Sequence, residues 1–178
     1  MTIAPTCFDS PRVPSTVYPP QQDSHLLIGA MTEAGLAPGA RVADLCTGSG
    51  VAALAAAAAG AAEVSAFDIC PEAVRHVRSS ALADGVDVQV HRGSWARAVE
   101  FGPFDLVVAN PPYVPHGPAD DSASIPASAG PARAWNAGAD GRRVLDPLCA
   151  AAPLLVDDGG PMLIVQAECA NSGRTVSA

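Results

Sequence analysis

The chain has 178 residues, of which 49% are hydrophobic and 16% are charged. This length suits one compact domain with a core of its own, and the composition excludes a charge-rich, disordered chain. The formal net charge of −8 gives an average field that repels nucleic-acid phosphates. We therefore expect nucleic acid to be a less favoured partner.

The five cysteines form neither a CxxC pair nor a cluster with histidine, so we expect no metal site and no disulfide framework. The longest apolar stretch, residues 51–62, is shorter than the roughly 18 residues that a membrane span needs. The N-terminus also lacks the charged segment of a signal peptide. These features predict a cytoplasmic protein without membrane contact.

Five prolines lie within residues 1–20, which predicts a flexible, extended arm ahead of a domain at residues 21–178. In that domain, Asp23 or Ser24 is placed to cap a first helix, because both side chains can accept hydrogen bonds from backbone amides. The apolar residues that follow have helical spacing. We expect this helix to end before Gly35.

Apolar strands then alternate with helices. We expect strands at residues 41–46, 62–68, 86–91, 104–110 and 161–168, and helices that begin at Val51, at Pro71, and at Asp140 or Gly141. Pro147 should kink or shorten the last helix, because proline lacks an amide donor. The alternation predicts an α/β, doubly wound, Rossmann-like fold with a mainly parallel sheet and a ligand site at the carboxyl ends of its strands.

The loop after the first strand, DLCTGSG, fits two kinds of nucleotide site. Gly48 and Gly50 match the dinucleotide fingerprint, and Asp68 stands at the distance expected for a ribose ligand. Asp44, however, would repel a pyrophosphate and attract the ammonium and sulfonium groups of S-adenosylmethionine (AdoMet). The acids therefore favour AdoMet, with Asp68 accepting the ribose hydroxyls. A ligand-free turn, with Asp68 as a helix cap, is the alternative.

The motif Asn110-Pro111-Pro112-Tyr113 ends the fourth expected strand. The lone pair of an amide or aromatic amine nitrogen is delocalised, and attack on a methyl group leaves positive character on that nitrogen. The Asn110 side-chain oxygen and the Pro111 carbonyl can accept its N–H groups and stabilise this state. The prolines stiffen the turn, and Tyr113 offers an aromatic face. The motif predicts methyl transfer to a planar nitrogen; an ordinary Asn-Pro turn is the alternative.

These stretches carry a family resemblance. In this order, DLCTGSG, AFD and VVANPPYVP resemble the class I methyltransferases and, within them, the HemK-type glutamine methyltransferases of peptide-chain release factors. VYPPQQDSHLL and AWNAGADGRRVLDPL resemble two segments of the short eukaryotic and archaeal branch of that family. The resemblance covers residues 17–168, nearly the whole chain.

The resemblance implies AdoMet as cofactor, a release factor as protein substrate and, as in the short branch, a small activator subunit. It also implies that Asn110, Pro111, Pro112 and Tyr113 hold the substrate amide. The expected cofactor-binding residues are Tyr18, Asp23, Ser24, Asp44, Cys46, Thr47, Gly48, Gly50, Asp68, Ile69, Ser94, Trp95 and Asn110.

The sequence departs from the family pattern in three places. Cys46 replaces the usual first glycine of the loop, which strains the turn if its φ is positive. Ser94 stands where the family has a carboxylate for the adenine amino group, so we expect modest cofactor affinity. The C-terminal strand pair of the family is missing after Glu168, which would leave the fifth strand uncovered and predicts self-association through it.

Other functions stay open on the residues alone: methylation of an exocyclic amine of a DNA or RNA base, methylation of a small molecule, and a non-catalytic cofactor-binding subunit. Trp135 either walls the substrate pocket or pins its loop to the core. Arg142 and Arg143 are expected on a solvated helix face with an acidic neighbour, because basic residues oppose the dipole of a helix start.

Overall fold

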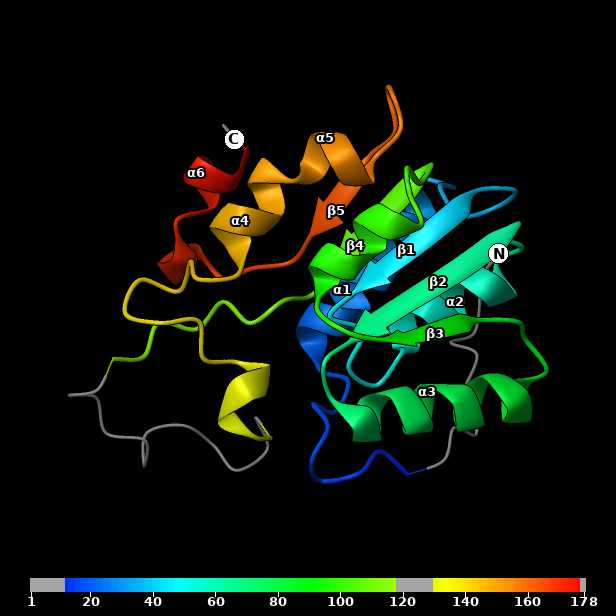
Figure 1. The fold of residues 1–178 in the computed structure, drawn as a ribbon, viewed down its shortest axis with the longest axis horizontal. Coiled ribbons are helices and arrows are strands. Elements are labelled where there is room, and N and C mark those ends of the chain that lie inside the picture. The colour runs from blue at the N-terminus through cyan, green and yellow to red at the C-terminus, as the bar shows by residue number, and fades with distance from the viewer. Residues whose placement is uncertain (1–11, 118–129, 177–178) are drawn as a thin grey trace.

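The computed structural model describes residues 12–117 and 130–176, which build a five-stranded parallel sheet covered by helices (Figure 1). The strands are β1 (Arg41–Leu45), β2 (Glu63–Asp68), β3 (Gln89–Arg92), β4 (Leu106–Ala109) and β5 (Met162–Ile164). Their order is β3-β2-β1-β4-β5, and all neighbours pair in parallel. The strand order reverses at β1, and such a switch point is where open α/β sheets bind their ligands.

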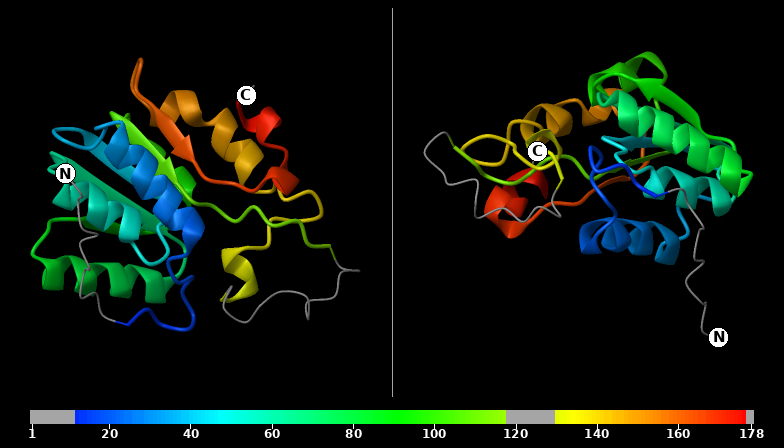
Figure 2. Two further views of the ribbon diagram at one scale, coloured as in Figure 1. Left: turned by 180° about the vertical axis from the view of Figure 1, so that it is seen from behind. Right: turned by 90° about the horizontal axis from the view of Figure 1, so that it is seen from below.

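Helices cover both faces of the sheet, which confirms the doubly wound, Rossmann-like prediction. One face carries α1 (Gln22–Glu33), α2 (Val51–Ala58) and α3 (Pro71–Asp84), and the other carries η1 (Trp95–Glu100), α4 (Leu145–Ala150) and α5 (Ala152–Leu155). The view from behind in Figure 2 shows α1 and α2 on the near side of the sheet. Three short helices complete the described chain: η4 (Ala132–Ala134), η5 (Glu168–Ala170) and α6 (Ser172–Val176).

The strands divide the core into two clusters. Val42 of β1 packs toward α1 and α2, whereas Ala43 and Leu45 pack toward η1, α4 and α5. Strands buried on both faces need apolar side chains at nearly every position, and this is why their runs could be found in the sequence. None of the helices within the described residues has both the length and the apolar character needed to cross a membrane.

Two helix starts differ from the expectation. The N-cap of α1 is Gln21, so Asp23 and Ser24 lie within the first turn instead of capping it. The helix expected from Asp140 or Gly141 begins at Leu145 instead and has six residues. Gly141 has a φ of 73°, which a right-handed helix does not allow. Pro147 then falls in the first turn of α4, where its missing amide is tolerated.

The C-terminal strand is shorter than predicted. β5 ends at Ile164, and the backbone turns into η5 at Glu168. Within the described residues β5 pairs with β4 alone, so it lies at the edge of the sheet as expected.

The end of the predicted N-terminal arm contacts the domain. Val17 is buried against Cys70 and Ala73, at the start of α3. The arm's first eleven residues, 1–11, lie outside the described residues.

Candidate functional site

One cavity of about 580 Å³ lies at the carboxyl ends of β1, β2 and β4. Its size is that of a pocket for a cofactor-sized molecule. Almost all the residues singled out from the sequence line it: Tyr18, Asp23, Ser24, Asp44, Cys46, Thr47, Gly48, Asp68, Ile69, Ser94, Trp95, Asn110, Pro111, Pro112 and Tyr113. The fold therefore brings segments that are far apart in the sequence to one site.

Gly50 is the exception, and its assignment as a cofactor-binding residue is not supported by its position. It is the N-cap of α2, with a φ of 82°. A Cβ atom here would lie 2.6 Å from Cγ2 of Val77 on α3. Gly50 thus allows α2 and α3 to pack closely, and it lies outside the residues that line the cavity.

The glycine loop between β1 and α2 has the strain expected at Cys46. Cys46 has a φ of 60° and Gly48 a φ of 54°. A positive φ is unfavourable for a side chain such as that of cysteine, and comparable backbone outliers cost on the order of 1 kcal/mol. The Gly48 amide donates to Oδ2 of Asp68 at 2.9 Å, so the acid that ends β2 holds the loop.

Asp44, near the end of β1, is 2% exposed. Its Oδ2 accepts hydrogen bonds from the Thr47 hydroxyl at 2.6 Å and from the Ala53 amide at 3.1 Å. Burial raises the pKa of Asp44 to about 7, and the charge of Asp68 adds to this effect. A cation in the cavity would favour the ionised carboxylate and lower that pKa.

Asp68 ends β2 and joins two loops. Besides the Gly48 amide, it accepts the Cys70 amide on Oδ1 at 2.8 Å. Cys70 is the N-cap of α3, so Asp68 orders the approach to the helix and does not itself cap it. Burial raises the pKa of Asp68, although these backbone donors and the charge of Arg133 act in the opposite direction.

Asp23 on α1 is the centre of a hydrogen-bonded cluster. Its Oδ2 accepts the hydroxyl groups of Tyr18 at 3.0 Å and Tyr113 at 3.1 Å. Its Oδ1 accepts the Ser24 amide at 2.7 Å and the Ser24 hydroxyl at 3.3 Å. Burial alone would raise the pKa of Asp23, but hydrogen bonds from Asn110, Ser24 and the two tyrosines outweigh it and lower the pKa. Asp23 is therefore ionised at neutral pH.

A second wall of the cavity was only partly anticipated. Arg133, Asn136 and Arg143 line it, together with Trp135, which is 8% exposed. Trp135 is buried and also lines the cavity, so both interpretations of its role stay open. The guanidinium of Arg133 donates to the Thr16 carbonyl at 2.7 Å and connects this wall to the N-terminal segment. No local motif marks these residues as a site; only the resemblance around Trp135 pointed to them.

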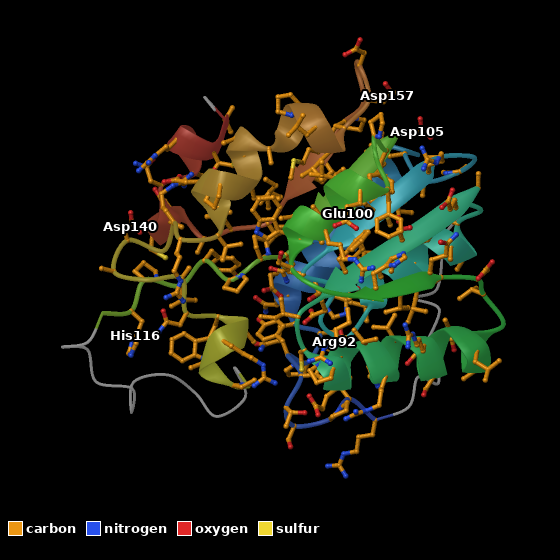
Figure 3. All side chains as sticks on the ribbon, viewed as in Figure 1. Arg92, Glu100, Asp105, His116, Asp140 and Asp157 are labelled. Carbon is orange, nitrogen blue, oxygen red and sulfur yellow. The ribbon has the colours of Figure 1, made fainter. Side chains whose placement is uncertain are left out.

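His116 packs its ring edge against Trp135, with ring centroids 5.2 Å apart. Figure 3 shows its side chain at the outer end of the loop, away from the sheet. Among residues 12–117 and 130–176, no three His, Cys, Asp or Glu side chains gather in the manner of metal ligands.

Residues 20–125 match the family model described as methyltransferase small domain. The chain belongs to this family. The match extends from the start of α1 past the Asn110–Tyr113 turn, and so includes the glycine loop and both acids at the strand ends.

Two curated relatives are release factor glutamine methyltransferases. The protein from Deinococcus radiodurans is 41% identical over 126 residues, which is 70% of this chain and 44% of the relative. The protein from Rhodospirillum rubrum is 41% identical over 157 residues, which is 82% of this chain and 45% of the relative. The chain thus spans less than half the length of these two relatives.

A solved structure supports the fold. The 16S rRNA N2 methyltransferase from T. thermophilus, in complex with AdoMet and guanosine, aligns with a TM-score of 0.66. The alignment covers 89% of this chain and 38% of that chain, at 21% sequence identity. At this identity the likeness shows a shared fold.

Proposed function

We propose that this chain binds AdoMet and transfers a methyl group to the side-chain amide nitrogen of a glutamine in a peptide-chain release factor. One observation carries the proposal: the Asn110-Pro111-Pro112-Tyr113 turn lines the same cavity as Asp44 and Asp68. Two relatives, both release factor glutamine methyltransferases, support the glutamine acceptor and the release factor. A release-factor substrate would also place the reaction in the cytoplasm, as the sequence predicts.

The residues at the strand ends fit AdoMet. Asp44 provides a buried carboxyl group beside the glycine loop, which suits a cationic ligand and disfavours a pyrophosphate. Each carboxylate oxygen of Asp68 accepts one backbone amide and has a further lone pair for a ribose hydroxyl. Ile69 and Trp95 add apolar surface to this part of the cavity. When bound here, AdoMet supplies a methyl group made electrophilic by its sulfonium.

The turn after β4 suits a planar amide. The Asn110 oxygen and the Pro111 carbonyl would accept the two N–H groups of the substrate amide and stabilise the positive character that develops on nitrogen. Pro111 and Pro112 restrict the backbone, so these acceptors are held in place before the substrate binds. Tyr113 gives the amide plane a face to pack on.

Asn110→Ala tests this assignment. We expect AdoMet affinity near that of the wild type and a fall in kcat of about 10²-fold or more, because the side chain acts on charge that develops during transfer. Calorimetry gives the affinity, and methyl transfer to a glutamine-containing substrate gives kcat. Gln89→Ala is the control. It removes an exposed side-chain amide at the start of edge strand β3, outside the cavity, and should keep full activity. Near-normal turnover by Asn110→Ala would remove the basis of the proposal.

Two partner predictions extend the proposal. We infer self-association through β5, because it is an edge strand whose side chains Met162, Leu163 and Ile164 are only half-buried. Light scattering at several protein concentrations tests this, and a monomer at every concentration would contradict it. A small activator subunit is a further proposal that rests on the resemblance alone.

A further inference from the structure

The carboxylate of Asp23 connects three segments of the cavity wall. Tyr18 belongs to the N-terminal segment, Ser24 to α1 and Tyr113 to the turn after β4, and all three donate hydrogen bonds to it. Removing this one side chain would therefore break the hydrogen bonds that link the turn carrying Asn110 to the other two segments.

Asp23 has little capacity left for a ligand. An ionised carboxylate offers about four lone-pair sites. The two tyrosine hydroxyls occupy Oδ2, and the amide and hydroxyl of Ser24 occupy Oδ1. A direct contact to cofactor or substrate would have to displace one of these donors. From the sequence, Asp23 is one of the expected AdoMet-binding residues. Its hydrogen bonds make it better suited to hold its neighbours than to bind AdoMet.

The identity of the donors fixes the orientation of the turn. A carboxylate only accepts hydrogen bonds, so the Tyr18 and Tyr113 hydroxyls both act as donors to Asp23. Tyr113 has a single hydroxyl proton, which it gives to Asp23. The described residues place no cation in an ion pair with Asp23. Its charge therefore acts on the cluster itself.

We propose that Asp23 is a positioning residue for methyl transfer: through the Tyr113 hydroxyl it holds the turn that carries Asn110 in the place that the acceptor amide requires. This inference rests on the proposed function.

Kinetics of Asp23→Asn test the role in transfer. The substitution keeps the shape of the side chain but replaces one acceptor oxygen by an NH₂ donor, so the two tyrosine hydroxyls and Ser24 can no longer all donate to it. We expect kcat to fall by about 10²-fold, the loss typical of a misplaced catalytic group, with AdoMet affinity within about threefold of the wild type. Glu33→Gln, an exposed acid at the other end of α1, is the matched control and should keep wild-type kinetics.

A second measurement does not depend on activity. The chain has two tyrosines, Tyr18 and Tyr113, and both bond to Asp23. Burial, and then the Asp23 charge, raises the pKa of Tyr113 well above 10.0. In a Tyr18→Phe background, the ultraviolet absorbance of tyrosinate reports on Tyr113 alone. Adding Asp23→Asn should shift this titration to lower pH, while circular dichroism at the same pH values verifies that the protein stays folded.

The outcomes separate the alternatives. Weaker AdoMet binding with unchanged kcat in Asp23→Asn would make Asp23 a cofactor ligand and overturn the inference. An unchanged Tyr113 titration would show that Asp23 does not hold Tyr113 and would overturn it equally. If the wild-type chain transfers no methyl group to glutamine, the proposed function fails instead, and the titration still decides whether Asp23 holds the turn.

Discussion

At the scale of single residues, Asp44 should make AdoMet binding depend on pH. Its pKa is raised to about 7 by burial, so the carboxyl group of the cofactor-free protein is largely neutral below that pH. Only the ionised form attracts a cation. We expect AdoMet affinity to rise from about pH 6 to about pH 8 in the wild type and to stay flat in Asp44→Asn. Calorimetry over this range decides it, and a flat wild-type profile would contradict the role of Asp44.

The same group affects the stability of the cofactor-free protein. Its folded pKa lies above the ordinary value of 3.8, so the folded state binds the proton more tightly than the unfolded state. Its contribution to stability is complete at low pH and is lost as pH rises from about 4 to about 7, at up to about 1.4 kcal/mol for each pH unit. Asp44→Asn should lack this loss, so its free energy of unfolding should rise relative to that of the wild type over this pH range. Urea unfolding at several pH values measures the difference.

At the scale of elements, Gly50 should contribute more to stability than a glycine in open space. In Gly50→Ala the new methyl group would collide with Val77, in addition to the strain of a positive φ. Gly60 has a φ of 90°, and apart from its chain neighbours no heavy atom would lie within 4 Å of a Cβ at this position. We expect Gly60→Ala to cost about 1 kcal/mol and Gly50→Ala about 1 to 3 kcal/mol more. Equal losses in urea unfolding would show that α2 and α3 can move apart easily.

Elements could be predicted from the sequence where local signals suffice. β1 and β2 begin and end within a residue of their predicted ranges, because each is an apolar run closed by a loop or an acid. α3 begins at Pro71 and is followed by Gly85 with a φ of 67°, as their positional preferences indicate. Positions set by distant contacts were missed, since nothing near Gly50 in the sequence shows that Val77 packs against it.

In the candidate site, too, the residues placed by local signals could be predicted, and those placed by distant contacts could not. Asp44, Asp68 and Asn110 lie at or next to the carboxyl ends of parallel strands, so the topology alone brings them together. Arg133 and Arg143 lie in a long connection whose path depends on tertiary contacts, and their place in the cavity wall could not be read from spacing.

At the scale of the whole molecule, Arg142 connects the last third of the chain. Arg142 is 3% exposed, so the prediction of a solvated position is wrong for this residue. The predicted acidic neighbour is present: Nε of Arg142 lies 2.6 Å from Oδ1 of Asp146. Its guanidinium also donates to the carbonyls of Ala170 and Asn171 and to the hydroxyl of Thr175, and so holds η5 and α6 beside α4 (Figure 1). Burial is possible because these acceptors replace water.

Arg142→Met should therefore lower the free energy of unfolding by about 3 kcal/mol, since it leaves the carbonyls of Ala170 and Asn171 without this donor and Asp146 with Arg174 as its one remaining ion-pair partner among the described residues. Arg143→Met is the matched comparison, because Arg143 is exposed and, within the described residues, its guanidinium donates one hydrogen bond, to the Asn136 carbonyl. Its effect should stay within about 0.5 kcal/mol. Equal stability of the two variants in urea unfolding would mean that the Arg142 contacts add nothing.

The acceptor of the methyl group is the central claim, and one competition assay tests it most directly. The wild-type chain is incubated with methyl-labelled AdoMet, a release factor, and DNA and RNA oligonucleotides in equal amounts. We predict that label enters the protein, and that mass spectrometry finds the added methyl group on one glutamine side chain of the release factor. Label in an oligonucleotide and none in the release factor would contradict the account and favour methylation of an exocyclic base amine, which offers the same planar nitrogen to the Asn110–Tyr113 turn.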